Sequence, residues 1–137
     1  MRTTLLGLLL LAGAAFGDGF KVIVNAANPV SSVAKEKVAK MFLKKVSRWE
    51  NGSAVVPVDQ PDEAEPRRAF SEEVIGKSVA GVKSYWQQQI FSGRDVPPPE
   101  RKSNDSVVAF VKDDPGAIGY VSAGADTSGV KVLTVTP

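Results

Sequence analysis

The stretch Asp113-Asp114-Pro115-Gly116-Ala117-Ile118-Gly119-Tyr120-Val121-Ser122 decides how the second half of the chain folds. Its first four residues end a short helix that we expect to begin at Asn104, because a proline disfavours helix both at its own position and at the preceding one. The remaining residues, 117–122, form a short apolar run that predicts a buried strand. A helix followed directly by a strand is a unit typical of α/β domains.

The rest of the chain alternates strand and helix patterns in the same way. The further strands expected are 20–24, 54–58 and 130–135, and the further helices are 33–46, 66–75 and 79–91. Pro57 indicates that its strand lies at an edge of the sheet or ends early. Gly76 is expected to end the helix at 66–75. This order predicts one α/β domain in which helices flank a mixed or largely parallel sheet.

Capping and burial follow from the same patterns. Ser31 or Ser32 is expected to cap the helix at 33–46, and Ser78 the helix at 79–91. We expect the latter helix to bury an apolar stripe made of Val79, Val82, Trp86 and Ile90. The aromatic residues Trp49, Tyr85, Trp86 and Phe91 are expected in the core and not on a stacking surface.

The first 17 residues have the pattern of a signal peptide. Arg2 precedes an apolar run over 5–16, and Ala15 and Gly17 are the small residues that a signal peptidase reads. An uncleaved membrane anchor would need about 20 apolar residues, and a core helix would need a polar face. We therefore expect a leader at 1–17, a single domain at 18–137, and export to the periplasm.

The composition excludes several classes of function. The 137 residues include neither cysteine nor histidine, which removes disulfides, thiol and imidazole chemistry and most transition-metal sites. With 17 basic and 15 acidic side chains, the chain has no strong field to attract nucleic acid or a membrane surface. The basic face of the helix at 33–46 is therefore interpreted as a solvated surface.

Two motifs resemble the phosphate-binding periplasmic proteins, which are the substrate-binding components of phosphate ABC transporters. The first is Val24-Asn25-Ala26-Ala27-Asn28-Pro29-Val30-Ser31-Ser32, followed by Met41-Phe42-Leu43-Lys44-Lys45 and Trp49, and the second is Asp114-Pro115-Gly116-Ala117-Ile118-Gly119-Tyr120-Val121. The resemblance covers about 20–123 and implies a single lobe of a type II periplasmic-binding-protein-like fold. It implies an exported domain that binds phosphate or another oxyanion weakly. Its partners would be a membrane permease or a second chain that supplies the missing lobe.

The chain departs from this family at the anion-binding loop. Ala64, Glu65 and Pro66 stand where the family has Ser, Gly and Thr, directly before Arg67-Arg68-Ala69-Phe70. Ala64 lacks a hydroxyl, Pro66 lacks a hydroxyl and an N–H, and Glu65 brings a negative charge to a site for an anion. If a ligand site is retained, we expect it at Ala64, Glu65, Arg67 and Arg68, with the arginines either holding the anion or pairing with Asp62, Glu63 or Glu65.

Other chemistry has weaker support in the sequence. Asp59, Asp62, Glu63 and Glu65 could hold Ca²⁺, but their spacing lacks the glycine and the bidentate residue of a calcium loop, so a solvated loop is the simpler interpretation. No serine has a histidine to activate it. We therefore expect no enzyme activity, no cofactor and no metal. The alternative to phosphate binding is a non-catalytic interaction or scaffold protein of the cell envelope.

Overall fold

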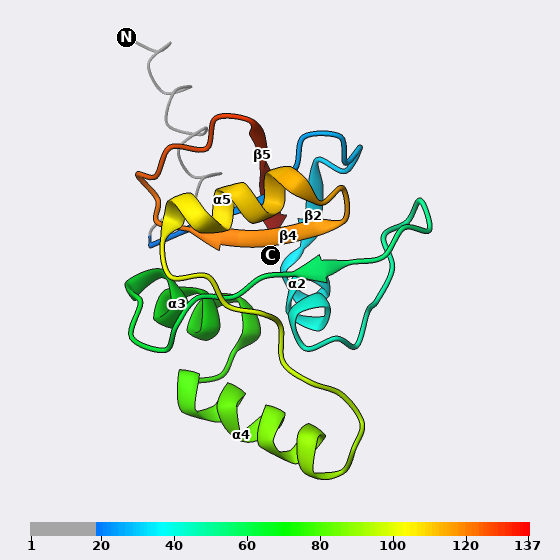
Figure 1. The fold of residues 1–137 in the computed structure, drawn as a ribbon, viewed down its shortest axis with the longest axis vertical. Helices are drawn as coiled ribbons and strands as arrows, with labels where there is room; N and C mark the ends of the chain where they lie inside the picture. Colours follow the sequence, from blue (N-terminus) through cyan, green and yellow to red (C-terminus); the bar gives the residue numbers. More distant parts are fainter. Residues whose placement is uncertain (1–18) are drawn as a thin grey trace, which may run out of the picture.

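The computed structural model describes residues 19–137, and its elements are arranged in layers (Figure 1). A five-stranded sheet forms the middle layer. Helix α5 (Asn104–Asp113) covers one face of the sheet, and helices α2 (Lys35–Phe42) and α3 (Glu65–Phe70) lie on the other. The predicted signal peptide at 1–17 lies outside the described residues.

The sheet is mixed, as the element order predicts. Its strands are β1 (Lys21–Asn25), β2 (Ser32–Ala34), β3 (Val56–Pro57), β4 (Ala117–Val121) and β5 (Val130–Thr136), arranged in the order β2-β5-β1-β4-β3. The central strand β1 is antiparallel to β4 and β5, while the edge strands β2 and β3 run parallel to their neighbours β5 and β4. The prediction that Pro57 lies in an edge strand is confirmed.

Strand side chains alternate between two cores, one on each face of the sheet. Val22 and Val24 of β1 pack with α2 and α3, whereas Ile23 packs with Val107 and Val111 of α5. This is the two-residue period expected of a sheet that is covered on both faces. Within helix 104–113, Ser103 is the N-cap and forms a reciprocal capping box with Ser106.

The helix expected over 33–46 is wrong at both ends. Ser32–Ala34 forms strand β2, because pairing with β5 lets Val33 enter the core at 8% exposure. The helix begins at Lys35, and its N-cap is Ala34 with no side-chain cap, so neither Ser31 nor Ser32 has the predicted role. It ends at Phe42, and Lys44 follows with a left-handed φ of 60°.

The helix expected over 66–75 is present but changes its winding. Glu65–Phe70 is α-helical, and Ser71–Ile75 continues as a π-helix, labelled η2. The Ser71 hydroxyl donates to the Lys77 carbonyl at 2.6 Å, so it ties the wider turn to the residue beyond the helix. Gly76 ends the helix in the left-handed conformation at φ 79°, as predicted.

Helix α4 (Val79–Phe91) has the predicted bounds and the predicted Ser78 cap, but it does not have the predicted environment. It lies beyond the layers around the sheet, at the foot of the molecule in Figure 1. Val82 and Trp86 are buried, whereas Ile90 is 52% exposed and Phe91 is 95% exposed. The burial predicted for Ile90 and Phe91 is wrong, because the last turn of α4 extends past the body of the protein that could cover it.

Candidate functional site

The candidate site is the loop that follows β3, at the point where the resemblance places the anion-binding loop. Asp59 and Gln60 continue directly from β3 and are buried at 7% and 3% exposure. The Asp59 amide donates to the Pro99 carbonyl, and the Arg101 amide donates to the Asp59 carbonyl. The segment around Glu100 is thereby held against the loop, although it lies 41 residues further along the chain than Asp59.

Arg67 lies at the centre of this site and points inward. Its side chain is 5% exposed, and Nη1 donates to the Gln60 carbonyl at 2.5 Å. Its guanidinium lies 3.3 Å from Asp59 Oδ1, 3.8 Å from Asp62 Oδ1 and 3.7 Å from Glu100 Oε2. We call Asp59, Asp62, Arg67 and Glu100 the Arg67 cluster. Three carboxylates and one carbonyl surround a single cation.

The Asp59 carboxylate is held by neutral donors as well as by the arginine. Oδ1 accepts hydrogen bonds from the Tyr120 hydroxyl and from the Gln60 amide, the latter at 2.9 Å. Burial raises the pKa of Asp59, and the Arg67 cation and these two donors offset part of that effect. Burial also raises the pKa of Tyr120 far above its ordinary value, and the adjacent Asp59 charge adds to the rise. Tyr120 is therefore a donor in this site and not an acid.

Ring packing fixes the position of the Tyr120 hydroxyl. Phe70 stacks on the Tyr120 ring with centroids 4.2 Å apart and planes at 10°. The Gln60 side chain donates to the Tyr120 carbonyl at 2.8 Å. Since Phe70 is on α3 and Tyr120 is on β4, this stacking joins the helix that carries Arg67 to the sheet.

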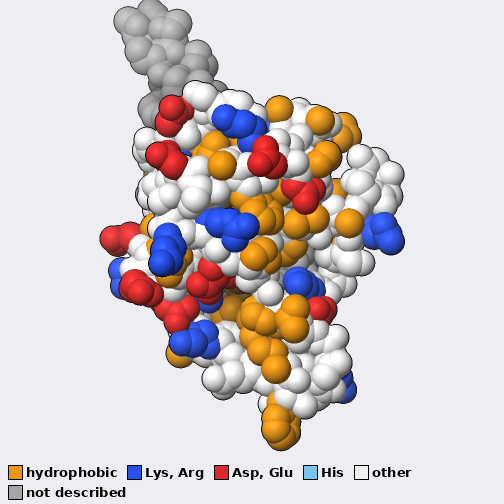
Figure 2. All heavy atoms as spheres, viewed as in Figure 1, with side chains coloured by type: hydrophobic (Ala, Val, Ile, Leu, Met, Phe, Trp, Pro, Cys, Tyr) orange, Lys and Arg blue, Asp and Glu red, His pale blue; other side chains and the backbone are white. Residues whose placement is uncertain are grey.

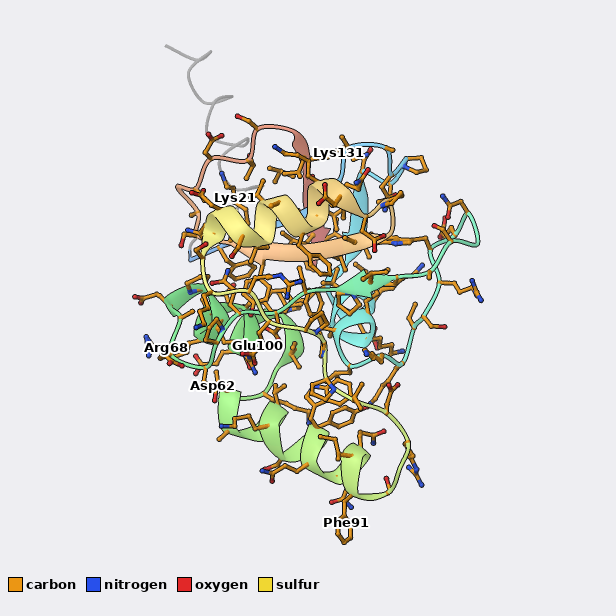
Figure 3. The ribbon with its side chains drawn as sticks, in the orientation of Figure 1. Lys21, Asp62, Arg68, Phe91, Glu100 and Lys131 are labelled. Carbon is orange, nitrogen blue, oxygen red and sulfur yellow. The ribbon has the colours of Figure 1, made fainter. Side chains whose placement is uncertain are left out.

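A second ion pair connects the cluster to α4. Lys83 Nζ donates to Asp62 Oδ2 at 2.7 Å, and this hydrogen bond holds the pKa of Asp62 below its ordinary value. Burial raises the pKa of Glu100, the neighbouring carboxylate. Figure 3 shows Asp62 and Glu100 on the same side of the molecule, above α4.

The other residues predicted for the site are placed differently from Arg67. Ala64 is the N-cap of α3 and makes no side-chain cap, and Glu65 opens the helix. Arg68 is 61% exposed at its side chain and lies 3.5 Å from Glu65 Oε2. The two arginines face different surroundings, since Arg67 is buried and Arg68 is in solvent. The prediction that they pair with nearby acids describes both of them.

A groove of about 460 Å³ opens between the Arg67 cluster and α4. Its charged lining consists of four carboxylates and two cations, namely Asp59, Asp62, Glu63, Glu100, Arg67 and Lys83. Its apolar lining consists of Pro61, Trp86, Ile90, Pro97 and Pro98. Figure 2 shows apolar side chains gathered over the lower part of this face, where α4 lies. The groove thus combines an excess of carboxylates with an apolar lining.

The two motifs of the resemblance have structural roles in this chain. A Cβ on Gly116 would lie 2.0 Å from the Ala54 carbonyl oxygen, and a Cβ on Gly119 would lie 2.8 Å from Val58 Cγ1. The Asn25 side chain donates to the carbonyls of Val111 and Lys112, at 2.8 and 3.1 Å, and so closes the end of α5. These residues determine how strands and helices approach one another.

Sequence reasoning missed Gln60, Glu100 and Tyr120 as members of the site. Tyr120 was visible as the tyrosine of the second motif, but nothing in the sequence joins it to Asp59. Glu100 follows three prolines in what reads as a plain polar loop. Among residues 19–137 there is no group of three or more acidic, histidine or cysteine side chains that could hold a metal ion.

The fold defines a class: one lobe of an α/β fold like that of the periplasmic phosphate-binding proteins. Similar solved structures include an ABC-type phosphate transport receptor from Vibrio cholerae, with a TM-score of 0.66 and 21% identity over 85% of this chain. They also include a phosphate ABC transporter substrate-binding protein with bound phosphate from Clostridium perfringens, with a TM-score of 0.67 and 21% identity over 86% of this chain. PstS from Borrelia burgdorferi has a TM-score of 0.66 and 15% identity over 86% of this chain.

These likenesses establish the fold. This chain spans about half the length of the proteins it matches, 45% of the first two and 47% of the third. The predicted resemblance is confirmed at the level of the fold, as is the prediction of a single lobe flanked by helices. No family model matches the sequence, and no curated protein is significantly similar to it. In the described part of the chain, no helix is long and apolar enough to cross a membrane.

Proposed function

We propose that this chain is an exported, non-catalytic binding lobe of the cell envelope, which docks another protein and does not capture phosphate by itself. The observation that carries the proposal is the position of Arg67. Its guanidinium is buried and already lies beside Asp59, Asp62 and Glu100. A guanidinium holds phosphate through a free planar fork of N–H donors. In this chain the Gln60 carbonyl and three carboxylates already lie against those donors.

The charges of the groove support the same conclusion. A phosphate there would meet four carboxylates and two cations. Two like charges about 4 Å apart repel by about 4 kcal/mol at an effective dielectric constant of about 20. Drawing Arg67 towards the anion would also leave the buried Asp59 carboxylate without its cation, and breaking a buried pair in this way costs about 3–5 kcal/mol. A lone lobe of this kind should be a poor phosphate binder.

The far end of α4 supports a docking role. Phe91 is 95% exposed, Ile90 is 52% exposed and Val96 is 59% exposed. We call Ile90 and Phe91 the α4 tip, which Val96 follows in the next loop, and Figure 3 shows Phe91 projecting from the foot of the molecule. Neighbouring exposed apolar side chains, such as Ile90 and Phe91, are typical of surfaces that bind another protein. The tip adjoins the groove, since Ile90 belongs to both.

A second candidate function is weak oxyanion binding within a phosphate transport system. It is favoured by the likeness to a structure that holds phosphate and by the exposure of Arg68. The Arg68–Glu65 pair is solvated, and such pairs contribute little, so an anion could displace Glu65. In that case Ala64, Glu65, Arg67 and Arg68 would line the anion site. A second chain would supply the missing lobe, and a membrane permease would receive the ligand.

Calorimetry with phosphate and with sulfate tests the proposal. The wild-type protein should give no binding heat at millimolar anion. A variant that restores the family loop, Ala64→Ser with Glu65→Gly and Pro66→Thr, should gain measurable phosphate binding because it regains two hydroxyls and an N–H. The control is Glu63→Gln, which removes one exposed charge from the same loop without restoring a donor.

Light scattering on the same samples separates the two candidates. A monomer that binds phosphate with micromolar affinity would overturn the docking proposal and support the oxyanion function. A phosphate-blind protein that self-associates, and that becomes monomeric when Phe91 is changed to Ser, would support docking through the α4 tip.

A further inference from the structure

The two edges of the sheet differ in one respect that matters for binding. At edge strand β3, the amides of Val56 and of Val58, which follows the strand, donate to the carbonyls of Gly116 and Ile118 on the β4 side. The position between them, Pro57, therefore faces outward. Proline has no N–H to offer. The β3 edge is thereby blocked at Pro57, a common device of natural sheets, and just beyond it Asp59 already pairs with the segment at 99–101.

The β2 edge has no such closure. In the described chain β2 pairs with β5 alone, in the register Ser32↔Thr134, Val33↔Val135 and Ala34↔Thr136. The Thr134 amide donates to the Ser31 carbonyl at 2.9 Å. Because the backbone groups of successive strand residues point to alternate edges, the groups of Ser31 and Val33 face β5. The amides of Ser32 and Ala34 therefore face the open edge.

Side-chain burial agrees with an accessible edge. Ser32 and Ala34 are both exposed, and only Val33 between them is buried. No charged residue or proline lies within β2. The polar backbone groups along this edge match the hydrogen-bonding pattern of an extended peptide.

A cavity lies beside this open edge. It has a volume of about 330 Å³ and is lined by all three residues of β2. Its apolar wall is formed by Pro29, Val30, Met41 and Trp49. The Trp49 indole N–H is already bonded to the Gly116 carbonyl at 2.9 Å, so the ring offers the cavity its apolar surface. Lys37 and Glu50, which lie 3.7 Å apart, are also in the lining.

We propose that an extended peptide segment adds to β2 as a sixth strand and places one aliphatic side chain in the cavity lined by Val30, Val33, Met41 and Trp49. The backbone of the segment would bond to the amide and carbonyl of Ser32 and to the amide of Ala34, whose carbonyl belongs to the N-cap of α2, and these bonds give affinity. The cavity would select the side chain, as it does in other strand-addition sites. This site is separate from the groove beside Arg67 and stands whether or not the docking proposal holds.

A single substitution, Ala34→Pro, should close this edge without disturbing the fold. Ala34 has φ −65° and ψ 143°, which are values that proline adopts without strain. Its amide faces away from β5, so Ala34→Pro removes no bond of the sheet. The residue before it, Val33, is in a strand, which is the conformation that a following proline favours. Ala34→Pro should fold normally and give β2 the same protection that Pro57 gives β3.

The test measures binding of a capped heptapeptide of alternating Thr and Val, using nuclear magnetic resonance titration of the full chain. The wild-type protein should bind it with millimolar to high-micromolar affinity, and Ala34→Pro should bind about tenfold more weakly, since one donor of the ladder is lost. The matched control ligand is the same peptide with alternate amides N-methylated, which keeps the side chains and should not bind.

The cavity has its own pair of variants. Val30→Asp places a charge in the cavity wall and should weaken binding about tenfold or more. Val132→Asp makes the same change at an exposed valine of β5 that lines no part of the cavity, and should leave binding unchanged. Should Ala34→Pro fail to fold, hydrogen exchange of the wild-type amides decides, because the peptide should slow the amides of Ser32 and Ala34. Absence of binding at millimolar peptide, or unchanged exchange of these amides, would overturn the proposal.

Discussion

Tyr120 donates its hydroxyl hydrogen bond to the carboxylate of Asp59 in the interior of the protein, 61 residues away in the chain. This contact joins the strand of the second motif to the loop where the resemblance places a ligand. Because Asp59 also lies beside Arg67, the tyrosine orients the acid that holds the arginine inward. The buried Asp59–Arg67 pair and the Tyr120 hydroxyl that donates to it should therefore be affected together by mutation.

Removing the tyrosine hydroxyl should therefore destabilise the protein. Tyr120→Phe leaves a buried carboxylate with one donor fewer, and we expect a loss of about 1–3 kcal/mol in the free energy of unfolding. Urea denaturation followed by circular dichroism measures it. Tyr85→Phe is the matched control, because the Tyr85 hydroxyl bonds to the Leu43 carbonyl at 3.1 Å in a half-buried position. A loss in Tyr85→Phe as large as that in Tyr120→Phe would contradict the special role of Asp59.

Acid should stabilise the protein through Asp59 over a defined range. Its folded-state pKa is raised above 3.8, so the native protein binds a proton more readily than the unfolded chain. The Asp59 contribution to stability therefore falls as pH rises through the folded-state pKa, and grows as pH falls from that value to 3.8. Wild type should gain stability relative to Asp59→Asn as pH is lowered from neutral.

The pKa shift of the neighbouring Asp62 has the opposite sign, so its contribution to stability depends on pH over a different range. Its folded-state pKa is lowered by the hydrogen bond from Lys83, so its contribution is present above 3.8 and is lost only below that value. A difference between wild type and Asp59→Asn that is flat from neutral pH to 3.8 would show that burial does not govern Asp59.

The glycine at position 119 should be irreplaceable for steric reasons. A Cβ there would lie 2.8 Å from Val58 Cγ1 and 2.9 Å from Val107 Cγ1. Gly119→Ala should cost about 1–3 kcal/mol by forcing α5 away from the sheet. Gly124→Ala is the control, since nothing lies within 4 Å of its added carbon and its φ is not positive. It should change stability by no more than about 0.5 kcal/mol. Adding Val107→Ala to Gly119→Ala should recover part of the loss, and a failure to do so would argue against the clash.

Truncation of two phenylalanines should change the free energy of unfolding by very different amounts. Phe70 is 1% exposed and contacts the Tyr120 ring, so Phe70→Ala should cost about 3–5 kcal/mol. Phe91 is 95% exposed, and Phe91→Ser should change the free energy of unfolding by about 0.5 kcal/mol or less. Thermal unfolding of the two variants gives both values. A large loss in Phe91→Ser would mean that the α4 tip contributes to folding, which would remove the argument that it is kept exposed for a partner.

Local sequence signals predicted most of the fold. Ser78 and Gly76 marked the ends of their helices because capping depends on residues a few positions apart. Strand β2 was missed because Ser32–Ala34 is stabilised by pairing with Thr134–Thr136, a hundred residues further on. The exposure of Phe91 was missed for a similar reason. Its helix has an apolar stripe, but whether a stripe is covered depends on where the helix lies.

The candidate site was predictable only in part. The loop at Ala64–Arg68 was identified by its departure from the motif, and pairing of its arginines with Asp62, Glu63 or Glu65 was one of two alternatives left open. The burial of Arg67 was not, because the residues that enclose it come from three segments around Asp59, Glu100 and Tyr120. The sequence shows that acidic partners are available to an arginine. Only the packed structure shows whether the arginine keeps free N–H donors for a ligand.

The positions of β1 and β5 have a consequence for how such a lobe can be built into a larger protein. The first and last strands are neighbours and run in opposite directions, with Val22 opposite Leu133. The segment that enters the sheet and the segment that leaves it therefore run side by side. A longer polypeptide could carry this unit as a cassette on two adjacent linkers, and removing it would sever no strand pairing.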